Sequence, residues 1–372
     1  MKLFIAGDLC PQARILSKIS KGEFDILDRD IKRVINEADY SIVNFECPII
    51  KGYEKPIQKS GPNLSCPVES LALIKEMGFK AVTLANNHFR DYGQEGVVNT
   101  LETFKKAGVE IVGGGVTEGD ARKMLCIRKE GKVVTIINAC ENEFSIATRD
   151  NGGANPLDII NLYEDINNAK QNSDLIVVIL HGGVEHYQLP TPRMKRLYCH
   201  IIDLGADVIV NHHQHCYSGY EIYKGKPIFY GIGNFCFDRD KARNSIWNYG
   251  FAVVIKYEKD VTFEIHPYEQ CNMEASIKGI PYDKFIHDIM CLNSIIEDNS
   301  RLEDAFDNFI LSKKMNFLTK IIPFENRWIK ALFRRNYLGT WFSEKKLVEL
   351  KNITTCESHL ETYQLLFKLL TK

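Results

Sequence analysis

Residues 174–183 read Asp-Leu-Ile-Val-Val-Ile-Leu-His-Gly-Gly, an apolar and largely β-branched run that stops at a histidine. Residues 207–215 repeat this arrangement as Asp-Val-Ile-Val-Asn-His-His-Gln-His. Short apolar runs bounded by polar residues are typical of buried strands in parallel sheets. Both histidine clusters would then lie at the carboxyl end of a strand, where open α/β sheets bind their ligands.

Similar runs alternate with amphipathic segments through roughly the first 270 residues, which predicts an α/β fold built on layered sheets. The predicted strands are Leu3–Ala6, Ser41–Asn44, Ala81–Ala85, Glu110–Val112, Val133–Ala139, Leu175–Leu180, Val208–Val210, Ile228–Tyr230, Phe251–Tyr257 and Val261–Ile265. One predicted helix opens near Pro67 and stops at Gly78, and another opens at Pro192 and stops at Gly205. The last two strands are separated by a short charged link, which favours an antiparallel hairpin.

The pattern changes from about residue 280, where Leu, Ile, Phe, Lys and Glu recur at helical spacing as far as residue 372. We therefore expect two parts, a main domain over residues 1–270 and a helical C-terminal extension over residues 280–372.

One segment of the extension, residues 323–345, interleaves aromatic and basic side chains, as in Trp328, Lys330, Arg334 and Trp341. This pattern predicts an amphipathic helix that packs its aromatic face on the main domain. Peripheral contact with a membrane or a partner is the alternative interpretation.

Composition narrows the range of partners and locations. The chain has 47 Lys and Arg against 48 Asp and Glu, a formal charge of -1, so we expect no nucleic-acid partner. The 11 cysteines occur singly and without a Cys-x-x-Cys pair, which favours reduced thiols and a cytoplasmic location. The apolar run before Gly7 is too short for a signal sequence, and we expect no transmembrane segment.

The histidines are concentrated in one part of the chain. Six of the 10 histidines lie within the segment from His181 to His215. A single histidine at a strand end is usually a hydrogen-bonded surface residue. Here the histidines follow two separate strands, and His213 and His215 form an alternating pair that can aim at one centre. This clustering favours a binding role over the surface alternative.

Oxygen donors follow three further predicted strands: Asp8 after the first, Asn44 and Glu46 after the second, and Asn87 with His88 after the third. Mixed carboxylate, amide and imidazole donors suit Mn, Zn or Fe better than Mg, and they outnumber the ligands of one tetrahedral ion. We therefore expect two divalent metal ions. Ions roughly 3.5–4 Å apart can activate water for attack on a phosphoester and clamp the phosphoryl charge.

Six blocks of sequence occur in a recognisable order. They are Gly7-Asp8, Asn44-Phe45-Glu46, Ala85-Asn86-Asn87-His88 with Asp91-Tyr92-Gly93, His181-Gly182-Gly183 with Glu185, Gly205-Ala206-Asp207 leading to His212-His213-Gln214-His215, and Gly225-Lys226-Pro227 leading to Gly233-Asn234-Phe235 and Asp238. This succession resembles the bacterial CapA-type proteins of poly-gamma-glutamate capsule synthesis, a branch of the calcineurin-like metallophosphoesterases. The resemblance covers residue 1 to about residue 270 and implies a four-layer α/β/β/α sandwich.

The resemblance also implies roles for individual residues. The implied metal ligands are Asp8, Glu46, Asn87, His181, His213 and His215. His88 would steady or protonate the leaving oxygen, and Asp91 would orient His88, although Asp91 can also be read as a helix N-cap. Glu185 is a candidate acid/base or supporting carboxylate, with a solvated loop residue as the alternative.

Several positions depart from the family pattern, among them Cys10, Gly182 and His186. Cys10 stands where the opening Asp-x-His motif of the superfamily has its histidine, and it can either bind Zn or Fe as a thiolate or pack as a small apolar residue. Gly182 and His186 stand where family members commonly have Trp and Tyr, a change expected to alter a substrate wall more than the metals.

These observations predict a metal-dependent, phosphoesterase-like hydrolase of capsule or cell-envelope polymer metabolism. Its substrate would be a small molecule or a polymer, phosphorylated substrates included, and capsule-synthesis proteins are candidate partners. The alternative is a non-catalytic scaffold or assembly component of polyglutamate or capsular polysaccharide synthesis.

Overall fold

A computed structural model describes residues 1–321, 326–335, 337–338, 342–355 and 367 of the chain. The chain divides into two compact units, Met1–Glu303 and Asp304–Lys372. Trp341 and parts of the segment 323–345 lie outside the described residues.

The first sheet of unit 1 is mixed. Its strand order is β18 (Ile277–Gly279), β17 (Val261–Gln270), β16 (Tyr249–Tyr257), β1 (Lys2–Leu9), β2 (Tyr40–Phe45), β5 (Ala81–Thr83) and β6 (Glu110–Val112), and β15 (Asn234–Cys236) also pairs with β1. β1, β2, β5 and β6 run parallel, whereas β16 and β17 form the expected antiparallel hairpin.

The second sheet has six strands in the order β13 (Tyr220–Tyr223), β14 (Lys226–Phe229), β12 (Val208–His212), β11 (Leu175–His181), β9 (Lys132–Cys140) and β8 (Leu125–Lys129). All ten predicted strands are present in the two sheets. The pattern missed the edge strands β8 and β13, which are partly exposed and therefore lack a continuous apolar run. It also missed β15, β18 and the two-residue pairs β3 (Ile49–Ile50) with β4 (Cys66–Pro67) and β7 (Gly114–Gly115) with β10 (Gly153–Ala154).

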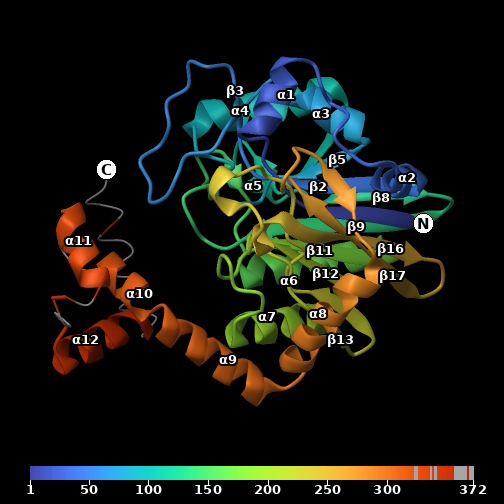
Figure 1. The fold of residues 1–372 in the computed structure, drawn as a ribbon. Coiled ribbons are helices and arrows are strands. Elements are labelled where there is room, and N and C mark those ends of the chain that lie inside the picture. Colours follow the sequence, from blue (N-terminus) through green and yellow to red (C-terminus); the bar gives the residue numbers. More distant parts are fainter. Residues whose placement is uncertain (322–325, 336, 339–341, 356–366, 368–372) are drawn as a thin grey trace. The chain divides into compact units, whose positions relative to one another are not determined.

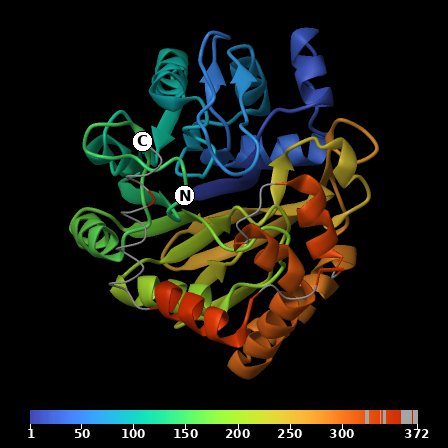
Figure 2. The ribbon, with the colours of Figure 1, turned by 90° about the vertical axis from the view of Figure 1, so that its left-hand side faces the viewer.

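Helices cover the outer faces of both sheets (Figures 1 and 2). α1 (Arg14–Ser20), α2 (Arg29–Glu37), α3 (Ser70–Met77) and α4 (Gly93–Ala107) pack on the first sheet, and α6 (Ile159–Lys170) and α7 (Pro192–Leu204) pack on the second. A short helix, α5 (Glu118–Ala121), contacts β7. The four layers expected from the resemblance are therefore present.

Two apolar cores separate the layers. On β1, Phe4 points into the core beneath α1–α4, and the next residue, Ile5, points into the core between the two sheets. Because alternate residues of a strand face opposite sides, a strand buried on both faces must be apolar throughout. This requirement explains why the central strands could be predicted from continuous apolar runs.

Local signals fix the ends of two helices as predicted. α3 ends at Gly78, which adopts a left-handed conformation with φ 86°. α7 begins with Pro192 in its first turn, and the side chain of Thr191 accepts a hydrogen bond from the amide of Met194.

The C-terminal part of the chain is helical in its described residues. α8 (Tyr282–Ile296) belongs to unit 1, because Phe285 and Ile289 join the core between the sheets. The chain continues through α9 (Asn299–Ser312), α10 (Lys314–Ile321), α11 (Arg327–Arg334) and α12 (Glu344–Thr355). In α11, Phe333 is buried and Trp328 is exposed, and the two interpretations of this segment stay predictions.

Within the described residues, none of the helices combines the length and the apolar character needed to cross a membrane.

Candidate metal centre

Strand pairing brings the predicted donor residues to one edge of the two sheets. Asp8 on β1 lies opposite Asn44 on β2 and opposite Asn234 on β15. In the second sheet, His181 on β11 lies opposite His212 on β12. The carboxyl ends of parallel strands meet at the same edge, so residues far apart in the sequence become neighbours there.

A close backbone contact supports this arrangement beneath Asp8. A β-carbon on Gly7 would lie 1.9 Å from the carbonyl oxygen of Gly233, so a residue larger than glycine would push the two segments apart. The amide of Asp8 donates a hydrogen bond to the same carbonyl at 3.1 Å. Glycine at position 7 therefore allows Asp8 and Asn234 to stand side by side.

Two groups of donors have the spacing of metal ligands, and they share one residue. Glu46, His181 and His213 form the first group, and Asp8, Glu46 and His215 form the second. Within each group the ligand atoms lie within 4.8 Å of one another, and all five side chains are buried. Glu46 is thus placed where a carboxylate can serve two cations.

The first group gains a fourth donor from Asn87. His181 Nε2 lies 3.0 Å from Asn87 Oδ1, 3.1 Å from His213 Nδ1 and 3.6 Å from Glu46 Oε1. Ligands at about 2.0–2.2 Å from one ion are separated by roughly 3–3.6 Å, which matches this spacing.

The second group is arranged around Asp8. His215 Nδ1 lies 3.5 Å from Asp8 Oδ2, and His215 Nε2 lies 3.6 Å from Glu46 Oε1. His212, which the sequence did not mark as a ligand, places Nδ1 3.2 Å from Asp8 Oδ1. Asn44 donates to Asp8 Oδ1 at 2.7 Å, so this carboxylate is held from several sides.

Glu46 shows most directly that these residues fit a cation. Its side chain is 0% exposed, and neither carboxylate oxygen has a hydrogen-bond partner among the described residues. Burial, followed by the negative charge of Asp8, raises the pKa of Glu46 well above its usual range. A buried carboxylate without a partner is costly, and a bound cation would offset that cost.

The other buried groups have strongly shifted pKa values. Burial opposes the ionisation of Asp8, but the neighbouring imidazoles of His212 and His215 outweigh it and hold the pKa of Asp8 well below its usual range. Burial and the neighbouring His213 lower the pKa of His181. Burial also lowers the pKa of His213 to about 4. Burial therefore favours the neutral forms of His181 and His213, which are the forms that bind divalent metals.

The segment after β12 is strained where it presents its histidines. His213 and His215 have φ values of 91° and 55°, in the region that favours glycine. Non-glycine residues adopt such angles at a cost that surrounding contacts must offset, and they gather at functional sites. The backbone therefore supports the predicted role of this histidine pair in binding.

Asn234 sets the orientation of His215. The side-chain amide of Asn234 donates to the carbonyls of His215 and Trp247 at 3.1 and 3.2 Å, which leaves Oδ1 facing His215 Nδ1 at 2.9 Å. Nδ1 must then carry the proton, and Nε2 keeps its lone pair for a ligand. This hydrogen bond connects the sixth sequence block, which contains Asn234, to the loop that carries His215.

The predicted pair of His88 and Asp91 is also assembled. His88 Nδ1 lies 2.7 Å from Asp91 Oδ2, and the amide of Leu64 donates to the same oxygen at 2.6 Å. The alternative role of Asp91 as an N-cap is not observed, because the residue before α4 is Tyr92 and no side chain caps the helix. Burial lowers the pKa of His88, although Asp91 opposes this effect.

Sequence reasoning missed Lys59. Its side chain is 2% exposed and forms an ion pair with Asp91, and its Nζ lies 3.1 Å from His88 Nδ1. Lys59 belongs to a polar loop between β3 and β4 that carries no motif. Glu54 anchors this loop by accepting hydrogen bonds from the backbone amides of Lys51, Gly52 and Tyr53.

Two acidic residues stand near the donor cluster. Burial opposes ionisation of Glu185, but electrostatic interaction with His215 and His213 holds its pKa below the usual range. Glu143, which the sequence analysis did not single out, places Oε1 3.8 Å from His213 Nε2. The role of Glu185 as an acid/base stays a prediction.

Cys10 packs in the apolar core beneath α1–α4 and is fully buried. Its amide donates to the Cys236 carbonyl at 2.9 Å, and its Sγ accepts a hydrogen bond from Gln12 at 3.5 Å. Neither donor group in the described part of the chain includes it. These contacts favour the packing role over the thiolate-ligand alternative.

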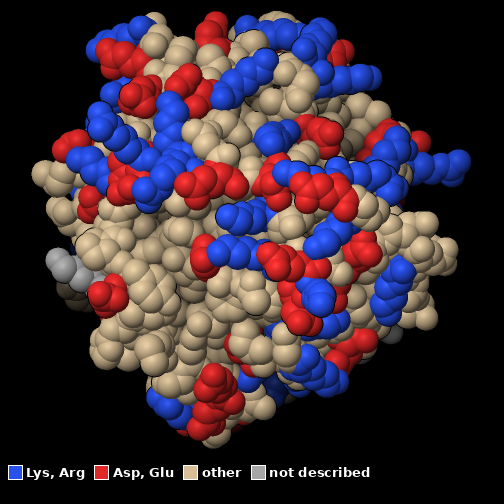
Figure 3. Space-filling view, turned by 90° about the vertical axis from the view of Figure 1, so that its right-hand side faces the viewer, with Lys and Arg blue, Asp and Glu red and all other residues tan. Residues whose placement is uncertain are grey.

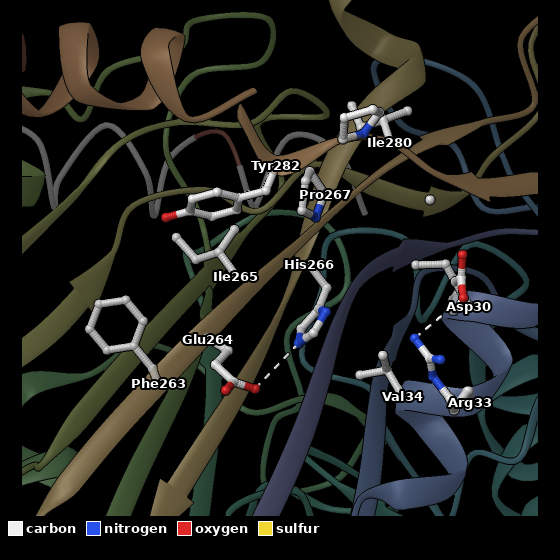
Figure 4. Close-up of a pocket in the computed structure, with 13 residues that line it drawn as sticks. Asp30, Arg33, Val34, Phe263, Glu264, Ile265, His266, Pro267, Ile280 and Tyr282 are labelled. Carbon is white, nitrogen blue, oxygen red and sulfur yellow. Dashed lines mark ion pairs between the residues drawn. The ribbon is translucent and has the colours of Figure 1, made fainter. Parts of the chain in front are cut away.

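A separate surface groove of about 690 Å³ lies between α2 and β17, lined by residues such as Arg33, Asp30, His266 and Glu264 (Figure 4). Its charged side chains pair with each other: Arg33 with Asp30 at 3.3 Å, and His266 with Glu264 at 3.7 Å. None of the donor residues lines it. On the face of the molecule seen in Figure 3, basic and acidic side chains are interspersed. The donor cluster is therefore the stronger candidate for a functional site.

The fold and site define a four-layer α/β/β/α protein with a candidate dinuclear metal centre. The sequence profile of the family described as "Bacterial capsule synthesis protein PGA_cap" matches residues 2–239. The chain belongs to this family, which confirms the resemblance found in its sequence.

Individual relatives agree with this assignment. The chain is 32% identical over 251 residues to the capsule biosynthesis protein CapA of Bacillus anthracis, covering 65% of this chain and 61% of that protein. It is 33% identical over 244 residues to the PGA biosynthesis protein CapA of Bacillus subtilis (strain 168), covering 64% and 63%. The matches thus span less than two thirds of these relatives.

Among solved structures, the calcineurin-like phosphoesterase YfkN of Bacillus subtilis is similar with a TM-score of 0.39 and 12% identity, covering 82% of this chain and 98% of that chain. A putative 5'-nucleotidase from Staphylococcus aureus is similar with a TM-score of 0.43 and 14% identity, covering 79% and 58%.

Proposed function

We propose that this protein is a dinuclear metal-dependent hydrolase that cleaves phosphoester bonds in capsule or cell-envelope polymer metabolism. The observation that carries the proposal is Glu46, a fully buried carboxylate without hydrogen-bond partners among the described residues that belongs to two donor groups. The relatives named for capsule and PGA biosynthesis support the polymer context.

The residues that would hold the two ions are Asp8, Glu46, Asn87, His181, His213 and His215. Their carboxylate, amide and imidazole donors suit Mn, Zn or Fe. When bound, two divalent cations supply a nucleophile at neutral pH and a positive clamp for phosphoryl charge. The protein itself then needs no nucleophilic Ser or Cys.

His88 is the residue proposed to act on the leaving group. Its Nδ1 lies 2.7 Å from Asp91 Oδ2, and Lys59 pairs with the same carboxylate. This contact fixes the plane of the ring and leaves Nε2 for exchange of a proton with the leaving oxygen. Burial lowers the pKa of His88, and the hydrogen bond with Asp91 opposes this effect.

Metal content and turnover test the proposal together. The protein is stripped with a chelator and reloaded with Mn²⁺, the bound metal is counted by elemental analysis, and hydrolysis of bis(4-nitrophenyl) phosphate is followed. We expect two ions per chain and activity only after loading. Glu46→Gln should lose both properties, whereas the matched control Glu258→Gln, at an exposed position, should keep them. Wild-type protein that binds no stoichiometric metal and shows no hydrolysis would instead support the scaffold function.

A further inference from the structure

An aromatic wall stands beside the second donor group. Trp247, in a short 3-10 helix (Ile246–Asn248), is 3% exposed, and its ring centroid lies 4.7 Å from that of His215. Phe237 packs edge-on against it at 4.9 Å, and the Trp247 indole N–H donates to the Phe237 carbonyl at 2.7 Å. The indole is therefore fixed in place, directly next to a proposed metal ligand.

A cation is stacked on this wall. The guanidinium carbon of Arg239 lies 5.2 Å from the centroid of the Trp247 ring, within the range of a cation–π contact. Arg239 itself is exposed. Stacking on a rigid ring orients the guanidinium but leaves its N–H donors available to a ligand.

The charge of Arg239 is not neutralised by its neighbours in the chain. Asp238 pairs with Arg14 and Arg243, and Asp240 pairs with Arg243 at 2.8 Å. Across the residues that the structure describes, Arg239 makes no ion pair with a carboxylate. Both adjacent acidic residues are thus taken by other arginines, so neither of them offsets the charge of Arg239.

His186 stands on the same wall. Its ring centroid lies 5.7 Å from that of Trp247 and 6.3 Å from that of His215, and its backbone is strained, with φ 61°. Burial lowers the pKa of His186, and His215 and Arg239 lower it further, whereas Glu185 raises it. Glu185 Oε2 lies 4.0 Å from His186 Nε2, so a carboxylate stands beside this imidazole. The positive charge on the aromatic wall is that of Arg239.

We propose that Arg239, stacked on Trp247 and assisted by His186, binds a second anionic group of the substrate beside the group held at the metal centre. This inference rests on the proposed function and narrows its substrate class to phosphoesters that carry a further carboxylate or phosphate. A guanidinium fork recognises either anion through paired N–H donors, and a fixed aromatic support reduces the entropy lost on binding.

Binding of non-hydrolysable probes tests the subsite separately from turnover. Full-length, Mn-loaded protein is titrated calorimetrically with phenylphosphonate, 3-carboxyphenylphosphonate and 1,3-phenylenebisphosphonate. We expect wild type to bind at least one of the two probes that carry a second anionic group about tenfold more tightly than phenylphosphonate. This is the effect of one charge-assisted contact. The more strongly preferred probe identifies carboxylate or phosphate as the second anion.

Variants assign this preference to the wall. Arg239→Gln should reduce the affinity ratio to near one and His186→Gln should reduce it less, whereas Arg128→Gln, exposed on β8, should keep the wild-type ratio. A wild type without preference, or an Arg239→Gln variant that keeps it, overturns the inference. An Arg239-dependent preference in a protein that hydrolyses no phosphoester would contradict the proposed function and leave the anion subsite standing.

Discussion

Lys59 Nζ lies 3.1 Å from His88 Nδ1, although the two residues belong to different loops. The lysine side chain is 2% exposed and is paired with Asp91, which also contacts His88. A buried ammonium group at this place opposes protonation of the imidazole and holds the carboxylate in a fixed position. Lys59 is therefore a positioning residue for His88.

Lys59→Met should lower kcat by at least tenfold while the metal content stays at the wild-type level, because the change removes support for His88 but no ligand. Burial is the main cause of the low pKa of His88, and the charge of Lys59 adds to it. Without that charge the pKa of His88 rises, so the limb of the pH–rate profile that reports His88 should move to higher pH. Lys55→Met, an exposed change in the same loop, is the control. An unshifted profile with lower kcat would show a merely structural role.

Glu46→Gln should stabilise the metal-free protein at pH 7 even though it prevents metal binding. The pKa of Glu46 is raised by burial and by Asp8, so the native state holds its proton more tightly than the unfolded state, and ionisation above pH 4.5 costs stability. A neutral amide avoids this cost, so the free energy of unfolding of the metal-free variant should exceed that of the wild type by about 1–3 kcal/mol. Thermal unfolding of chelator-treated wild type and variant measures the effect, and an equal or lower Tm for the variant would contradict it.

His213 should make the metal-free protein sensitive to mild acid. Burial lowers the pKa of His213 to about 4 from 6.5. Between these values the unfolded state binds more protons, so stability falls as the pH drops from 6.5 towards 4. Between pH 6.5 and pH 4, the free energy of unfolding of the wild type should fall by about 3 kcal/mol more than that of His213→Gln. Urea unfolding at several pH values measures the difference. His200→Gln, an exposed substitution on α7, is the matched control.

Asn234→Ala should weaken metal binding about 10–100-fold, the usual effect of removing a partner that orients a ligating histidine. The physical reason is that Asn234 holds the proton on His215 Nδ1 and keeps Nε2 free. Calorimetric titration with Mn²⁺ measures the loss. Asn234→Asp keeps an acceptor for Nδ1 and should recover part of the affinity, and equal losses in both variants would argue against this role.

Cys10→Ala should leave the metal stoichiometry unchanged and reduce stability by about 1 kcal/mol, because a buried sulfur is lost from a packed core. Elemental analysis and urea unfolding separate the two effects. Loss of one ion per chain would show that Cys10 is a ligand after all.

Much of the fold was predictable because its central strands are buried on both faces. Strands such as β11 must then be continuously apolar, and that pattern is visible without a structure. Edge strands such as β13 escaped prediction, since one exposed face breaks the run. The predicted donor residues were identifiable because they follow these central strands directly.

The contacts beyond the donors were not predictable in this way. Lys59 lies in a polar loop, and nothing in its neighbours marks it as buried against His88 and Asp91. The stacking of Arg239 on Trp247 depends on how two turns pack, and the sequence offers no periodicity there.

The sequence alone determined the layered α/β class, the order of the strands along the chain and the residue types at each strand end. These features depend on local apolar runs and on the polar, glycine and proline residues that bound them. Only the tertiary structure decided that Glu46 belongs to two donor groups and that Asn234 orients His215. Those relationships depend on strand register between distant segments, and register is fixed by packing over the whole sandwich rather than by any local stretch.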